Sequence, residues 1–203
     1  MTDPETYVWY AAYGTNLSTA RLRCYVSGGR PSGAARHYDG CRDTSPPRDH
    51  RPVELAGRLS FAGESGVWGG GMAFFAVDGG DVVHARAYLL RLQQLGDLVA
   101  QEARRPVGTD LVLAVDGPTR HGLSRTYDVL LDLGELDGHR MLTLTGTSLP
   151  AANAPSAAYV RTMLEGLADG FGLDADARVA YLAAAGGVAP HWSVEALRRM
   201  LPA

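Results

Sequence analysis

The succession of short strand-like segments is the feature that most constrains the fold of this chain. Runs rich in β-branched and aromatic residues alternate with Gly, Asp and Pro, which favour turns. Because few helical patterns separate these runs, we expect an α+β protein with a small, mostly antiparallel β-barrel and flanking helices. The predicted strands are residues 7–13, 55–61, 71–77, 82–90, 111–115, 126–133 and 140–145.

Helical spacing is clearest in residues 89–105. Leu92, Leu95, Val99 and Glu102 recur at intervals of three and four residues, which places them on one helix face. A carboxylate at the end of an apolar stripe is partly desolvated and can act as a base and an acid near neutral pH. The sequence alone favours a simpler interpretation, in which this glutamate is a solvated partner of the arginines that follow it.

Length and composition indicate one compact domain. The chain has 203 residues with 46% hydrophobic content, and we expect one domain over residues 1–203 in which residues 171–203 form a helical extension. A formal charge of −3 gives no reason to expect a nucleic-acid surface, and no apolar run approaches the roughly 20 residues that span a bilayer. We expect a cytoplasmic protein that acts on a small molecule, with a homodimer as an open possibility.

The reactive residue types exclude several mechanisms. All 19 basic residues are arginine, so Schiff-base and Ser-Lys chemistry are excluded. The six histidines are scattered and the two cysteines match no zinc spacing, so we assign no metal. One alternative stays open, in which Cys24 or Cys41 is the nucleophile of an amide hydrolase or acyl transferase.

The candidate site lies at the end of the first predicted strand. Residues 7–17 read YVWYAAYGTNL, in which Gly14 permits a positive φ, and Asn16 and Ser18 can cap the chain that follows. A strand that ends in such a turn presents backbone N–H groups. Their fixed dipoles attract a carboxylate or a developing oxyanion.

The YGTNL turn resembles the YGSNL signature of the γ-glutamylcyclotransferase-like superfamily, with Thr15 in place of serine. Two further anchors follow in the expected order. Glu102 corresponds to the family's acid/base glutamate, and residues 154–161 resemble a Pro-Ser-x-x-Tyr helix start that contains Tyr159. Together the three anchors cover roughly residues 7 to 170.

The resemblance implies an enzyme that releases 5-oxoproline from a γ-glutamyl amide by attack of the substrate's own α-amine. Glu102 would move the proton, and no cofactor is required. The family does not define the leaving group, because relatives act on γ-glutamyl amino acids, glutathione, γ-glutamyl-lysine-type amines and γ-glutamyl protecting groups. The implied substrate-binding residues are Tyr13, Gly14, Thr15, Asn16, Leu17, Trp68 and Tyr159.

Structural alternatives accompany these assignments. Trp68 lies in a glycine-rich segment, residues 66–72, and a hairpin in which this tryptophan is packed would explain the segment equally well. Tyr159 fits an ordinary core stripe with Met163 and Leu167. Residues 27–52 form a long predicted loop, either a solvated connection or a segment that shapes a pocket through residues 40–43. The alternative function is a non-catalytic small-molecule-binding or interaction module on the same fold.

Overall fold

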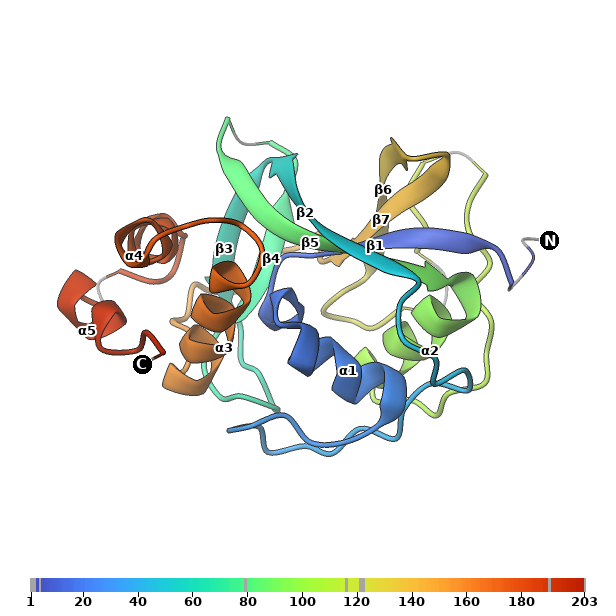
Figure 1. The fold of residues 1–203 in the computed structure, drawn as a ribbon, viewed down its shortest axis with the longest axis horizontal. Coiled ribbons are helices and arrows are strands. Elements are labelled where there is room, and N and C mark those ends of the chain that lie inside the picture. The colour runs from blue at the N-terminus through green and yellow to red at the C-terminus, as the bar shows by residue number, and fades with distance from the viewer. Residues whose placement is uncertain are drawn as a thin grey trace.

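The computed structural model describes residues 3, 5–78, 80–115, 117–120, 123–189 and 191–202; His121 lies outside these ranges. The strands are β1 (Tyr7–Ala12), β2 (Asp49–Ala56), β3 (Arg58–Ala62), β4 (Met72–Ala76), β5 (Val82–Arg91), β6 (Val129–Leu136) and β7 (His139–Thr145). The helices are α1 (Thr19–Ser27), α2 (Leu92–Glu102), α3 (Ala157–Ala168), α4 (Ala175–Ala184) and α5 (Val194–Arg198), and a 3₁₀ turn, η1 (Thr15–Leu17), joins β1 to α1. The expected α+β class is confirmed (Figure 1).

Five strands form one sheet in the order β2-β5-β1-β7-β6, and β3 pairs with β4 in a second sheet. The pairings are antiparallel except that of β1 with β7, where Trp9 is opposite Met141 and Tyr10 is opposite Leu142. The mostly antiparallel character is therefore confirmed. Because β1 is central and buried, its end carries the following turn into the interior of the molecule.

A threonine side chain joins the two sheets. The Thr145 hydroxyl at the end of β7 accepts a hydrogen bond from the Phe75 N–H at 3.0 Å and donates to the Phe75 carbonyl at 2.9 Å. Thr145 is buried. This side chain satisfies two backbone groups of β4 that a neighbouring strand would otherwise pair.

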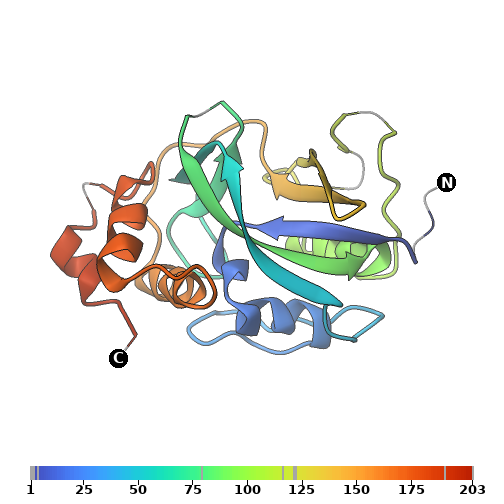
Figure 2. The ribbon, with the colours of Figure 1, turned by 45° about the horizontal axis from the view of Figure 1, so that its top comes forward.

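The helices cover the sheets in two groups (Figures 1 and 2). Helices α1 and α2 pack on the five-stranded sheet through a hydrophobic cluster that includes Leu22, Leu95 and Val99. Helices α3 and α4 share a second cluster with β3 and β4, to which Val179 and Leu182 contribute. The C-terminal helices lie at the end of the molecule beside β3.

Several predicted boundaries are wrong. The helix expected over residues 89–105 begins only at Leu92, because residues 89–91 belong to β5, and it ends at Glu102. Residues 55–61 are not one strand, because the chain turns at Gly57, where a side chain would overlap with the Phe75 ring. Residues 111–115 form no strand; Leu111 and Leu113 are buried and Val112 is exposed, so their alternation reflects packing near α2 without strand pairing. Strand β2 begins at Asp49, inside the predicted loop, and tolerates Pro52 because it is an edge strand.

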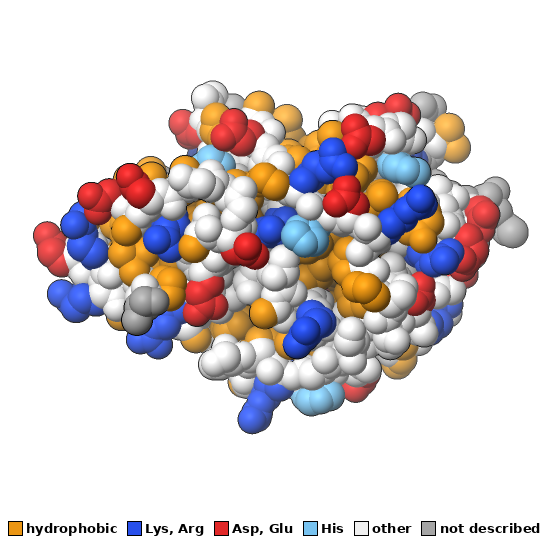
Figure 3. All heavy atoms as spheres, viewed as in Figure 1, with side chains coloured by type: hydrophobic (Ala, Val, Ile, Leu, Met, Phe, Trp, Pro, Cys, Tyr) orange, Lys and Arg blue, Asp and Glu red, His pale blue; other side chains and the backbone are white. Residues whose placement is uncertain are grey.

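The described surface carries charges of both signs. Figure 3 shows Arg and Asp or Glu side chains dispersed over the face that it presents. Within the described residues, no helix is both long and apolar enough to cross a membrane.

Candidate functional site

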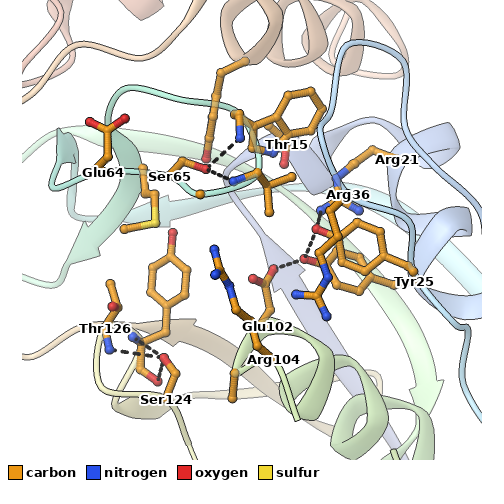
Figure 4. A pocket seen from close by; sticks show the side chains of 18 residues that line it. Thr15, Arg21, Tyr25, Arg36, Glu64, Ser65, Glu102, Arg104, Ser124 and Thr126 are labelled. Carbon is orange, nitrogen blue, oxygen red and sulfur yellow. Dashed lines mark hydrogen bonds between the residues drawn. The ribbon is translucent and has the colours of Figure 1, made fainter. Parts of the chain in front are cut away.

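Two adjoining cavities lie where the end of β1, the end of α2 and the start of α3 meet. The inner cavity has a volume of about 50 Å³, and the outer cavity, shown in Figure 4, has a volume of about 280 Å³. Four residues border both cavities: Thr15, Glu102, Tyr127 and Tyr159. The structure therefore brings the three sequence anchors together around one space.

The turn after β1 forms one wall of the inner cavity. Gly14 has φ −100°, so the positive φ that glycine permits is not used. Close approach explains the glycine instead, because a Cβ at this position would lie 2.9 Å from the Tyr159 hydroxyl oxygen. The Leu17 N–H donates to the Gly14 carbonyl at 2.9 Å and closes the turn, after which Ser18 caps α1 by accepting from the Arg21 N–H.

The residues of the turn divide between the cavity and the core. Tyr13, Gly14, Thr15 and Asn16 line the inner cavity. The Asn16 Nδ2 group donates to the Tyr10 hydroxyl at 3.4 Å, and within the described residues Asn16 Oδ1 has no partner. Leu17 does not line either cavity; its side chain is fully buried against Gly166 of α3, so its placement is that of a core residue.

Glu102 is the last residue of α2 and points into the space between the cavities (Figure 4). Leu95 and Val99 on the same helix face are buried in the core, as the spacing predicted, and fix the direction of this face. The Tyr25 hydroxyl from α1 donates a hydrogen bond to Glu102 Oε1. Glu102 is half-buried and is the one carboxylate among the described residues that line the inner cavity.

Phenol groups surround this carboxylate. Burial is the main cause that raises the pKa of five tyrosines: Tyr10, Tyr13, Tyr25, Tyr127 and Tyr159, the last to about 12. These phenols are neutral hydrogen-bond donors near pH 7. Two of them accept bonds from the protein, Tyr10 from Asn16 Nδ2 and Tyr159 from the Ala73 N–H at 3.2 Å.

The outer cavity contains arginines that sequence reasoning did not identify. Arg21 of α1 is 3% exposed, and its guanidinium carbon lies 4.2 Å from the Tyr25 ring centroid and 4.5 Å from that of Tyr38. Burial by itself lowers the pKa of Arg21, but Tyr25, Tyr38 and Glu102 outweigh this effect, so the group stays charged. The i, i+4 spacing of Arg21 and Tyr25, directly after the turn, is the signal that could have indicated this pair.

The residues after Glu102 end the helix in a common motif, but with an unusual residue at its left-handed position. The Arg105 N–H donates to the Ala100 carbonyl at 2.8 Å and the Arg104 N–H to the Gln101 carbonyl at 3.1 Å, the two bonds of a Schellman motif. The residue at the left-handed position is Arg104, with φ 56°, where glycine is usual. Its guanidinium reaches the outer cavity beside Gly66, at which any side chain would overlap with it.

Trp68 and Tyr159 both line the outer cavity, and both also pack against other rings. Their ring centroids are 5.9 Å apart, and the Tyr159 ring meets the Phe61 ring edge-on. The Ser65 hydroxyl accepts from the backbone N–H groups of Val67 and Trp68 at 3.3 and 3.1 Å, which orders the glycine-rich segment.

Residues 40–43 do not line these cavities. They are held to α2, where the buried Asp97 accepts from the Arg42 N–H at 2.9 Å and from the Arg42 side chain. The same long loop does contribute Arg36 and Tyr38 to the outer cavity. It is therefore part of the site through residues other than those that the sequence suggested.

The two cysteines lie outside the cavity linings. The Cys41 thiol donates to the Tyr25 carbonyl at 3.4 Å, and burial raises its pKa to about 12, so it is a thiol near pH 7. Cys24 is half-buried and directs its sulfur to the Ala20 carbonyl. Neither arrangement is that of an activated nucleophile.

The fold matches solved structures over almost its whole length. A γ-glutamyl cyclotransferase superposes with a TM-score of 0.57 and 17% sequence identity, over 96% of this chain and 99% of that chain. The chain has the γ-glutamyl cyclotransferase fold. An uncharacterized protein from Homo sapiens shares it, with a TM-score of 0.55 and 18% identity over 95% of this chain and 98% of that chain. No protein-family profile matches the sequence.

A curated relative outside the solved structures also matches. Histone deacetylase 5 from Arabidopsis thaliana is 30% identical over 199 residues, which cover 86% of this chain. This chain spans 30% of the length of that protein. The alignment therefore relates the chain to a part of a longer protein.

Proposed function

We propose that this protein is a cyclotransferase that releases 5-oxoproline from a γ-glutamyl amide. The observation that carries the proposal is the position of Glu102, the one described carboxylate on the inner cavity, opposite the Gly14 to Asn16 turn. The shared fold supports the same reaction class.

The proposed reaction is an internal aminolysis. Glu102 takes a proton from the substrate's α-ammonium group, the freed amine attacks the γ-carbonyl carbon, and a five-membered lactam forms as the amide C–N bond breaks. Glu102 then gives this proton to the departing nitrogen. The attacking nitrogen loses a second proton as it becomes the lactam N–H, and this proton also ends on the departing amine, which leaves as an ammonium ion. Because nucleophile and electrophile belong to one molecule, positioning alone can contribute on the order of 7 to 11 kcal/mol of barrier reduction.

The surrounding groups have matching roles in this proposal. Tyr10 and Tyr159 accept hydrogen bonds from the protein, so their own protons are available to the oxygen that becomes negative in the tetrahedral intermediate. The turn from Tyr13 to Asn16 holds the glutamyl carboxylate or this oxygen. Tyr25 orients Glu102 through its hydrogen bond.

The test is the release of 5-oxoproline, measured by mass spectrometry, from a panel of γ-glutamyl amides. We expect Glu102→Gln to lower kcat/KM by about 10²- to 10⁴-fold, the usual contribution of a general acid/base. Glu165→Gln, on the exposed face of α3, is the matched control and should retain activity. Equal activity of the wild type and Glu102→Gln would refute this role, and silence of the wild type across the panel would favour the non-catalytic module.

A further inference from the structure

Arg86 is a charged side chain in the interior of a buried strand. It lies near the middle of β5, between Ala85 and Ala87, and is 2% exposed. A buried charge is costly unless hydrogen bonds and an opposite charge compensate it. The proposed reaction gives this arginine no role, and its side chain borders neither cavity. The partners of its guanidinium group therefore indicate what the charge does.

The guanidinium group joins the turn after β1 to the end of α3. Arg86 Nε donates to the Leu17 carbonyl at 2.8 Å. Nη2 donates to the Gly166 carbonyl at 3.2 Å and to the Asp169 carbonyl, and it forms an ion pair with Asp169 Oδ2 at 3.4 Å. A cation is favourable at the C-terminal end of a helix, where the last carbonyls lack partners within the helix. Arg86 thus binds backbone groups of two elements that border the site.

Tyr88 acts on the same turn from the same strand. It follows Arg86 by two residues, so both side chains lie on one face of the sheet. The Tyr88 hydroxyl donates to the Asn16 carbonyl at 2.8 Å. Burial is the main cause that raises the pKa of Tyr88 above its usual value, so the phenol stays a hydrogen-bond donor near pH 7. Two successive carbonyls of the turn, those of Asn16 and Leu17, are therefore each held by one β5 side chain.

These carbonyls belong to the peptide units that close the turn. The Leu17 N–H donates to the Gly14 carbonyl at 2.9 Å, and the Ser18 N–H donates to the Thr15 carbonyl at 3.1 Å. Each N–H shares a planar peptide unit with the carbonyl of the residue before it, and one of the two β5 side chains holds that carbonyl. Holding the carbonyls therefore fixes the direction of both N–H groups and, with them, the shape of the turn.

We propose that Arg86 and Tyr88 position the turn after β1 for the reaction at Glu102. This inference rests on the proposed function and adds two positioning residues to it. The turn lies opposite Glu102 on the inner cavity, and a displacement of about 1 Å in a group that orients the substrate can cost roughly 100-fold in rate. Because β5 continues directly into α2 (Figure 1), one segment both holds the turn and carries the helix that ends at Glu102.

The test compares two variants that each remove one hydroxyl group. Tyr88→Phe removes the bond to the Asn16 carbonyl. Tyr181→Phe is the matched control, because its hydroxyl accepts from the His84 N–H of β5 at 3.1 Å and does not contact the turn. We expect Tyr88→Phe to lower kcat/KM for 5-oxoproline release by about 10- to 100-fold and Tyr181→Phe to keep it. Arg86→Lys keeps the positive charge but not the planar fork of donors, and should show a loss of the same order.

Amide hydrogen exchange provides a readout that does not depend on turnover. A turn that has lost an external hydrogen bond opens more often, which exposes the N–H groups that close it. We expect Tyr88→Phe and Arg86→Lys to speed exchange of the Leu17 and Ser18 amides by roughly 5-fold, the factor for about one lost hydrogen bond. Tyr181→Phe should leave these two amides unchanged. Tyr88→Phe decides the matter if Arg86→Lys does not fold.

The outcomes separate this inference from the reaction itself. Unchanged kcat/KM in the folded variants of Arg86 and Tyr88, or an equal loss in Tyr181→Phe, would overturn it. If the wild type releases no 5-oxoproline, the proposed function fails and hydrogen exchange alone decides. Faster exchange of the two amides in the Arg86 and Tyr88 variants then supports their hold on the turn, and unchanged exchange refutes it.

Discussion

Replacing Arg104 by glycine should stabilise the protein. Arg104 occupies the left-handed position of the Schellman motif after α2, with φ 56°. That conformation costs an L-residue roughly 1 to 2 kcal/mol. Glycine also increases the conformational entropy of the unfolded chain, which offsets about 0.5 to 1 kcal/mol of this gain. The expected net gain in unfolding free energy is therefore about 0.5 to 1 kcal/mol.

The control variant is Arg104→Ala, which removes the same guanidinium but keeps a Cβ in the left-handed region. The Arg104 side chain is exposed, so either variant loses little buried surface. For a chain of about this length, 1 kcal/mol shifts Tm by roughly 2 to 4 °C. We expect Arg104→Gly to melt a few degrees above Arg104→Ala.

Urea unfolding and thermal melting of the wild type and the two variants measure this difference. A glycine variant no more stable than the alanine variant would show that the left-handed conformation is not costly here. The two variants thus separate the backbone effect from the loss of the arginine side chain.

Two further predictions concern stability. Thr145→Val leaves two buried backbone groups of β4 unpaired and should lower the free energy of unfolding in denaturant by about 3 kcal/mol. The control Thr143→Val removes one hydrogen bond, to the Ala11 carbonyl, and should lower it by about 1 kcal/mol. Equal losses would contradict the role of Thr145 in joining the sheets. Burial lowers the pKa of His84 below its usual 6.5, so the unfolded state binds more protons, and stability is lost as pH falls below about 6.5. His84→Gln should lose less stability than the wild type between pH 7.5 and 5.5, and identical losses would exclude this contribution.

Local patterns in the sequence predicted the elements that depend on local physics. The apolar face of α2, the Ser156 cap of α3 and the buried strand before Gly14 all follow from residue type and spacing, and the structure contains each of them. The wrong boundaries occur where contacts between distant residues determine where an element begins or ends. The chain bends at Gly57 beside the Phe75 ring, which leaves no room for a side chain at this position, and residues 55–61 alone do not show which distant ring packs there.

The candidate site divides in the same way. Its turn and its glutamate were identifiable because they resemble a known pattern, although Leu17 proves to be a core residue. Arg21, Arg36 and Tyr38 were not identified, because their place in the cavity lining appears only when distant segments pack together. Arginine was also uninformative by type, since every basic residue of this chain is arginine.

The meeting of the turn and Glu102 follows from the lengths of two adjacent elements. Strands β1 and β5 are antiparallel, with Tyr7 opposite Arg91, so α2 starts beside the beginning of β1. From there, the 11 residues of α2 extend about 16 Å, while the seven steps from Tyr7 to Gly14 extend about 23 Å. Because these lengths are similar, the end of the helix lies near the end of the strand, within reach of a glutamate side chain. One residue inserted into α2 would rotate Glu102 by about 100° and turn it away from the cavity while the sheet stayed intact, so the helix length is itself a determinant of the site.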